Sequence, residues 1–288
     1  MSRLTKAALF MVISSGMFSL MQVIIAFTAE EIPIFEQLFF RNLIATIVTY
    51  FAVIKQKCKI MGKKENQVFL ASRAFFGYLA MITTFYASRY GNQADVSTIL
   101  KMTPFLVTFF AVIFLGEKVK KFQIISLIIA SVGLFFISNP KFNSNVFPLF
   151  IAFLALIFSS FAYTMIGKLK GREKPEVIIF YFSFTSTIAT IPFMLSDFVM
   201  PSLAMLVLLV CIGVSAALGQ IALTYSYVMA PASQVSIYNY SGIVFSIIFA
   251  YLFLGQSVKP TSLIGVVLVL FSALLVFFYS RNLDKKTD

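Results

Sequence analysis

The residues of this sequence with the clearest chemical potential are ionisable groups inside long apolar runs. Lys101 lies well inside an apolar run over 94–115, and Asp95 lies at its start. Glu36 and Arg41 lie in an earlier apolar run. A charged side chain inside a membrane helix is costly, so each one is a candidate for ligand binding or ion coupling. We expect Lys101 to contact a substrate or coupling ion, and Glu36, Arg41 and Asp95 to form a coupling or charge network.

Other interpretations of these charges remain open. In one interpretation Lys101 forms an ion pair with Asp95 or Glu36. In another, its apolar stem lies along the helix and places the ammonium at the membrane surface. Asp95 and Lys101 are six residues apart, about 240° around a helix, so they do not pair on one helix. Glu36 and Arg41 are likewise unsuitably spaced, so their partners must come from neighbouring helices. Arg73 lies close to the end of its apolar run, and we expect it to anchor that end at the membrane interface.

The residue types that are missing exclude several classes of function. The chain contains no histidine and two cysteines, Cys58 and Cys211, which do not form a CxxC pair. Ser-His-Asp and Cys-His nucleophiles and histidine metal sites are therefore excluded, and we expect no metal and no cofactor. No GxxxxGK[ST] loop for ATP is present. The basic residues form short clusters between apolar runs rather than a stripe, which argues against nucleic acid as a partner.

The composition requires a lipid environment. Hydrophobic residues make up 60% of the 288 residues and charged residues 12%, against roughly 45–50% and 25% in soluble domains. Runs long enough to span a bilayer as helices occur ten times, over 7–27, 35–54, 68–87, 94–115, 122–138, 146–166, 177–195, 203–224, 232–254 and 261–280. These runs lack the alternation of barrel strands. The sequence predicts an all-α integral membrane protein with ten transmembrane helices.

The basic residues predict the orientation of these helices. With a cytoplasmic N-terminus, seventeen Lys and Arg residues fall at the cytoplasmic ends of the runs and three fall outside. Positive residues favour the cytoplasmic side, so we expect both termini to be cytoplasmic. A cysteine introduced at Asn143 is predicted to react from outside the cell, and Cys58 is not.

The two halves of the chain resemble each other. Shifting 95–120 by 139 positions places it over 234–259 with nine identities, Gly116 on Gly255 among them, and Lys101 then falls on Tyr240. Five helices per copy is an odd number, so the second copy must be inverted in the membrane. Inverted repeats are typical of secondary transporters. We therefore expect two inverted five-helix repeats over 7–138 and 146–280.

The chain resembles the drug/metabolite transporter superfamily, and within it the ten-helix proteins with two EamA-type domains. The motifs that carry the resemblance are Pro33 through Arg41, Arg73, Pro104, Leu115-Gly116-Glu117 and Gly133. The second half departs from the pattern at Ile243, Gln256 and Ser272. The resemblance implies that the third and fourth helices of each repeat line a central cavity. It also implies a peripheral second helix, which favours a structural role for Arg41.

Polar and aromatic residues on the helices implicated by this resemblance are further candidates for substrate contact. They are Tyr78, Gln220, Tyr238, Asn239 and Tyr240. Three of them are consecutive and cover most of a helix circumference, so at least one must face away from lipid. The serine pairs 14–15 and 159–160 are expected to join helices to each other.

The sequence and the resemblance together predict a secondary active transporter rather than an enzyme. We expect it to move a small polar or amphiphilic metabolite, such as an amino acid, an amine or a nucleotide, by alternating access. We also expect transport to be coupled to protons or ions. The protein is expected to be a monomer or homodimer in the plasma membrane of a bacterium. The alternatives are a flippase for a lipid-linked precursor and a membrane-embedded transferase. The transferase is disfavoured because the carboxylates that would hold Mg²⁺ are scattered.

Overall fold

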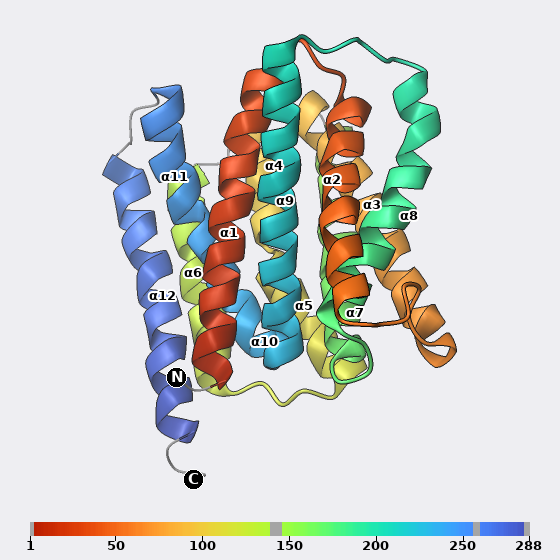
Figure 1. The fold of residues 1–288 in the computed structure, drawn as a ribbon. Coiled ribbons are helices and arrows are strands. Elements are labelled where there is room, and N and C mark those ends of the chain that lie inside the picture. The colour runs from red at the N-terminus through yellow and green to blue at the C-terminus, as the bar shows by residue number, and fades with distance from the viewer. Residues whose placement is uncertain (1–2, 139–145, 256–259, 285–288) are drawn as a thin grey trace.

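The computed structural model describes residues 3–138, 146–255 and 260–284, and this part of the chain is helical with short connections. The helices form a single bundle in which most axes run in one common direction (Figure 1). Their bounds are α1 (Arg3–Thr28), α2 (Ile34–Lys55), η1 (Lys64–Asn66), α3 (Gln67–Tyr90), α4 (Gln93–Lys101), α5 (Thr103–Phe110), η2 (Ala111–Leu115), α6 (Lys121–Ser138), α7 (Val146–Leu169), α8 (Pro175–Leu195), α9 (Leu203–Met229), α10 (Ala232–Val235), η3 (Ser236–Tyr240), α11 (Ser241–Leu254) and α12 (Pro260–Asp284).

The ten apolar runs are all helical. Eight helical segments in the described residues are long and apolar enough to cross a membrane, and two shorter apolar helices lie over Lys121–Ile137 and Thr261–Val276. Helices suit lipid because every backbone hydrogen bond is satisfied within the segment. Large apolar side chains such as Phe51 and Ile128 are more than half exposed on the outside of the bundle, as a lipid-facing surface requires.

Two runs are interrupted, which corrects the expectation of one continuous helix over each. In the run over 94–115, α4 stops at Lys101 and α5 begins at Thr103. Pro104 has no backbone N–H and leaves the Leu100 carbonyl without its helical partner. The Thr103 hydroxyl donates to that carbonyl at 2.6 Å and so compensates the break.

The second interruption lies at the corresponding place in the other half. The run over 232–254 begins as α10, tightens into the 3₁₀ segment η3 and continues as α11. Both interrupted runs end at a glycine with positive φ, Gly116 at 68° and Gly255 at 63°. The left-handed conformation ends a helix and is accessible to glycine without a steric penalty.

Helices from the two halves pack against each other. The most extensive contacts join α1 to α9, α3 to α7, α2 to α8 and α6 to α12. At the contact of α6 with α12 the backbones approach closely, because a Cβ at Gly133 or Gly265 would meet the carbonyl oxygen of the other glycine. Small residues permit such close helix packing in lipid.

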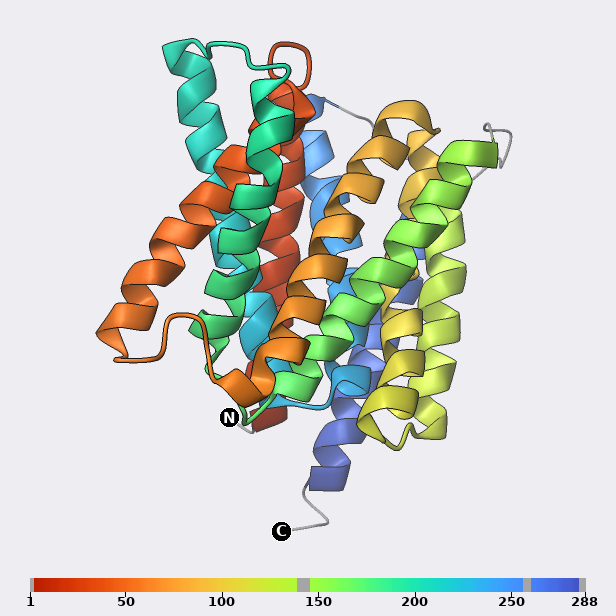
Figure 2. The ribbon, with the colours of Figure 1, turned by 90° about the vertical axis from the view of Figure 1, so that its right-hand side faces the viewer.

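The connections divide the bundle into two ends. We call the end that holds loops 56–63, 116–120 and 170–174 the basic end, and the end that holds loops 29–33 and 196–202 the opposite end. The start of α1 and the end of α12 both lie at the basic end (Figures 1 and 2). Asn143, the predicted outside position, lies outside the described residues.

Candidate functional site

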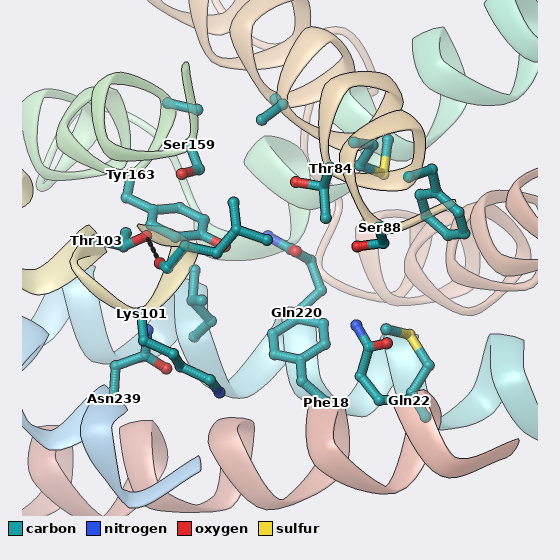
Figure 3. Close-up of a pocket in the computed structure, with 18 of the residues that line it drawn as sticks. Phe18, Gln22, Thr84, Ser88, Lys101, Thr103, Ser159, Tyr163, Gln220 and Asn239 are labelled. Atoms are coloured by element: carbon teal, nitrogen blue, oxygen red, sulfur yellow. Dashed lines mark hydrogen bonds between the residues drawn. The ribbon is translucent and has the colours of Figure 1, made fainter. Parts of the chain in front are cut away.

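A cavity of about 440 Å³ lies in the middle of the bundle. Its volume is within the range of small-molecule sites, about 300–1,000 Å³. Both halves of the chain line it: α1 to α5 contribute from the first half, and α7, α8, α9, η3 and α11 from the second. Figure 3 shows Lys101 and Asn239 at one side of the cavity, and Gln22, Thr84 and Ser88 at the other.

The cavity reaches the opposite end of the bundle. Its lining follows one face of α3 through Gly77, Met81, Thr84 and Ser88, and Ser88 is two residues from the end of that helix. Residues spaced by three and four lie on one helix face. Toward the basic end the lining on α3 stops at Arg73.

The basic end is held together by Glu117, which follows the Gly116 turn. The Ala232 and Ser233 amides donate to the Glu117 carboxylate at 2.8 and 2.9 Å, and the Ser233 hydroxyl donates at 2.6 Å. These bonds join the end of the interrupted run of the first half to the start of the run in the second half. Lys168 adds a bond from its ammonium to the Phe114 carbonyl at 3.1 Å.

The electrostatic surroundings of Glu117 include Lys170, which lies just beyond α7. Burial lowers the pKa of the Lys170 ammonium, and the charge of Arg3 lowers it further, whereas the Glu117 carboxylate raises it. The Glu117 carboxylate thus interacts with a basic residue of this end as well as with the two amides.

Lys101 ends α4 and faces the cavity. Within the described part of the chain no hydrogen bond or ion pair holds its ammonium. Its neighbour Asn239 comes from η3, and the Asn239 side-chain oxygen accepts a hydrogen bond from the Ser15 hydroxyl at 3.1 Å. The helix break places Lys101 at the end of α4, and its ammonium lies beside α11, where a Cβ at Gly242 would be 3.6 Å from the Lys101 Nζ.

Arg73 corrects one expectation. It is 2% exposed and lines the cavity, so it is no interface anchor. Its guanidinium lies over the Phe182 ring at 4.0 Å and near the Tyr163 ring at 5.9 Å. Although Arg73 lies near the start of α3, at the basic end, it points inward at the contacts of α3 with α7 and α8. Depth along a helix is readable from the sequence, whereas the direction of a side chain depends on packing.

Arg41 also lines the cavity, from α2. Its guanidinium donates to the Asn42 side-chain oxygen at 2.9 Å and lies 2.7 Å from the Met81 sulfur. Arg41 thus combines the expected structural contacts with a place at the cavity. Of the 23 Lys and Arg residues, twenty were assigned to the helix ends and loops in the topology count. Arg41, Arg73 and Lys101 are the other three.

The other predicted residues divide between the cavity and the protein interior. Gln220 and Asn239 line the cavity. Tyr238 and Tyr240 are buried in the apolar core instead, because successive residues of a 3₁₀ helix point about 120° apart and only Asn239 turns to the cavity. Tyr78 accepts a hydrogen bond from the Thr190 hydroxyl at 3.4 Å and lies outside the lining.

The two candidate acids lie outside the cavity lining. Glu36 is fully buried and accepts a hydrogen bond from the Val199 amide at 3.2 Å. It thereby ties the start of α2 to the loop before α9. Asp95 is buried in the first turn of α4. The structure brings Lys101 together with Asn239 and Gln220, and places Glu36 and Asp95 elsewhere.

Several lining residues were not among the predicted site residues. Thr84 and Ser88 lie on α3, and Ser97 lies on α4. The periodic face of small and polar residues from Gly77 to Ser88 was the signal that could have identified the α3 side. Among the described residues no cluster of three or more His, Cys, Asp or Glu could hold a metal ion.

Comparison with known proteins assigns this architecture. The model of the EamA-like transporter family matches the chain twice, over residues 5–139 and 146–278. The chain belongs to the EamA-like transporter family. It is thus a member of the drug/metabolite transporter superfamily with two EamA domains, as its sequence motifs indicated.

Similar proteins in this family are transporters. The chain is 30% identical over 268 residues to the pseudopaline exporter CntI of Pseudomonas aeruginosa, covering 92% of this chain and 94% of the relative. It is 29% identical over 270 residues to an uncharacterized transporter of Helicobacter pylori, covering 90% of each. A solved crystal structure shares the fold with a TM-score of 0.81 at 14% identity, covering 97% of this chain and 99% of that one. Transporters of this family are not enzymes.

Proposed function

We propose that this EamA-family protein is a secondary active transporter that moves a small polar or amphiphilic metabolite across the plasma membrane of a bacterium by alternating access. The observation that carries the proposal is the central cavity. It is lined by both halves of the chain, reaches the opposite end, and stops short of the basic end where Glu117 holds the two interrupted runs together. A site between two halves that is closed at one end is the arrangement that alternating access requires.

We also propose ten transmembrane helices arranged as two inverted five-helix repeats over 7–138 and 146–280. The proposed symmetry relates α1 to α7 and α3 to α9. The contact of α1 with α9 therefore corresponds to the contact of α7 with α3. The same symmetry relates α2 to α8 and α6 to α12, so each of these two contacts joins a pair of equivalent helices. The paired helix interruptions and the paired glycine caps support the same symmetry.

The distribution of charge supports an orientation with the basic end in the cytoplasm. Both chain termini then lie in the cytoplasm, as the positive-inside rule favours. In this orientation the cavity extends towards the outside, as far as Ser88 on α3. The relative CntI is an exporter, which supports outward movement of the substrate. We further propose that transport is coupled to protons or ions and that the protein is a monomer or homodimer.

Cysteine accessibility tests the transport cycle directly. In a chain without Cys58 and Cys211, single cysteines replace Ser97, which lines the cavity, and Ser236, which is fully buried towards the basic end. Alternating access predicts that Ser97→Cys reacts with an impermeant thiol reagent in right-side-out vesicles. Ser236→Cys reacts in inside-out vesicles, whenever the basic end opens.

The matched control is Ser272→Cys, because Ser272 is equally buried but lies on α12 away from the cavity. It should stay unreactive from both sides. Reaction of Ser236→Cys from both sides would indicate a channel, and its inertness in inside-out vesicles would contradict alternating access.

A further inference from the structure

The charge of the cavity is one-sided. Among the described residues that line it, Arg41, Arg73 and Lys101 are basic and none is acidic. These residues come from α2, α3 and α4, three different helices of the first half. Three cations directed into one cavity inside a membrane protein repel each other unless an anion joins them.

Some hydrogen-bond donors of these basic groups have no partner in the described chain. The Lys101 ammonium makes no hydrogen bond or ion pair within the described chain. The Arg73 Nε is buried without a hydrogen-bond partner, and the ring of Phe182 covers one face of its guanidinium. The bonds of Arg41 go to two uncharged acceptors, Asn42 and Met81.

The buried acids and the partly buried Glu117 lie outside the cavity lining and have other partners. Asp95 is buried in the first turn of α4 and has an interaction of its own. Glu36 accepts from the Val199 amide, and Glu176 accepts from the Tyr225 hydroxyl. Glu117 accepts from two backbone amides at the basic end. Rearrangement of one of these acids toward the cavity would therefore break bonds that already hold the bundle together.

The remaining lining suits an organic body. Phe18, Phe85 and Leu223 present apolar surface to the cavity, and Gln220 adds a side-chain amide whose Nε2 is buried without a hydrogen-bond partner. A guanidinium presents a planar fork that matches a carboxylate or a phosphate, and a ring on one of its faces holds that fork in place.

We propose that the cavity binds a small organic anion with two or more carboxylate or phosphate groups, held by Arg41, Arg73 and Lys101. This inference rests on the proposed transport function and assigns its substrate class. The cations lie on more than one helix, so a ligand with two acidic groups joins them, whereas a ligand with one acidic group leaves part of the charge unpaired. The ligand is a water-soluble metabolite, not a lipid headgroup.

Ligand-induced thermal stabilisation of the purified full chain tests the proposal. The probes are citrate, succinate, acetate, spermidine and glucose, each at about 10 mM and matched ionic strength, a concentration at which even weak binding stabilises measurably. We expect citrate and succinate to raise the melting temperature, acetate to raise it less, and spermidine and glucose to leave it unchanged. Stabilisation by spermidine or glucose without stabilisation by citrate, or by no anion at all, would overturn the proposal.

Variants assign the effect to the cavity. Lys101→Met should weaken citrate binding by about 10-fold or more, the loss expected for one charged hydrogen bond, while Lys101→Arg should retain binding. The matched control is Lys55→Met, which removes the same charge from an exposed position at the end of α2 and should change citrate affinity by less than about twofold. Equal weakening in both variants would mean a non-specific charge effect and would contradict the site.

Two further arms separate the possible failures. In nanodiscs with phosphatidylglycerol, citrate should still bind, and loss of citrate binding there would identify a lipid headgroup as the occupant. If citrate binds in a Lys101-dependent manner but Ser236→Cys never reacts from inside, the anion site stands and the transport function fails. If Ser236→Cys reacts as expected and only cations or neutral probes bind, the transport function stands and the substrate class is wrong.

Discussion

Glu117→Gln should open the basic end of the bundle. The carboxylate accepts three hydrogen bonds, at 2.8 and 2.9 Å from the Ala232 and Ser233 amides and at 2.6 Å from the Ser233 hydroxyl. A glutamine keeps the volume and one acceptor oxygen, but it loses the charge and the second acceptor. Hydrogen bonds to a charged group contribute about 1.5–3 kcal/mol each, so we expect a loss of about 2 kcal/mol.

This loss applies only to the state in which the basic end is closed, because the bonds span the two halves. Since 1.4 kcal/mol is a factor of ten in an equilibrium constant, the open population rises roughly 30-fold. Labelling of Ser236→Cys in inside-out vesicles reports that population, and its rate should rise by the same factor until the open state predominates. The melting temperature shows in parallel that the variant is folded.

Glu65→Gln is the matched control, since Glu65 is exposed on η1 at the same end of the bundle. Its labelling rate should equal that of the parent. If a folded Glu117→Gln variant labels Ser236→Cys no faster than the Glu65→Gln control, the Glu117 bonds do not hold this end closed and the reasoning is wrong.

The remaining predictions concern the cavity, the topology and the helix ends. Lys101→Met should fold at normal abundance but lose transport in proteoliposomes, because the charge faces the cavity and makes no hydrogen bond or ion pair with the described chain. Wild-type transport would exclude a role in substrate contact. A cysteine replacing Met200, which is 83% exposed in the loop at the opposite end, should react from outside intact cells while Cys58 does not, and the reverse pattern would invert the orientation. Gly116→Ala and Gly255→Ala should each lower stability by about 1–2 kcal/mol, measured as a lower melting temperature, since the glycines have positive φ and open space around the added methyl; an unchanged stability would refute the caps.

The helical runs were predictable because lipid solvation is a local property. Each segment must satisfy its own backbone and present apolar side chains, whatever its neighbours are. All ten predicted runs are helical in the structure. The interruption after Lys101 was only partly predictable: Pro104 marked a weak point, but the Thr103 hydroxyl bond that stabilises the break depends on local geometry.

The direction of side chains was less accessible. Arg73 was expected at the membrane interface because of its position near a helix end, yet it points inward over the Phe182 ring. Among three consecutive candidates, only Asn239 reaches the cavity, while Tyr238 and Tyr240 are buried in the core. The 3₁₀ geometry of η3 determines which of the three side chains faces the cavity, and no residue pattern in the sequence predicted it.

The amino-acid sequence alone determined the membrane class, the helical segments, the internal resemblance of the halves and the family. Each of these follows from composition, spacing or motif order along the chain. The tertiary structure decided which faces of the helices surround the cavity, and it brought Arg41, Arg73 and Lys101 from three helices to one space. The physical reason is that the rotation of a helix about its axis is set by the partners it packs against. Those partners lie up to more than 200 residues away along the chain, as the bond from Ser15 to Asn239 shows, so no local pattern records where a buried charge will point.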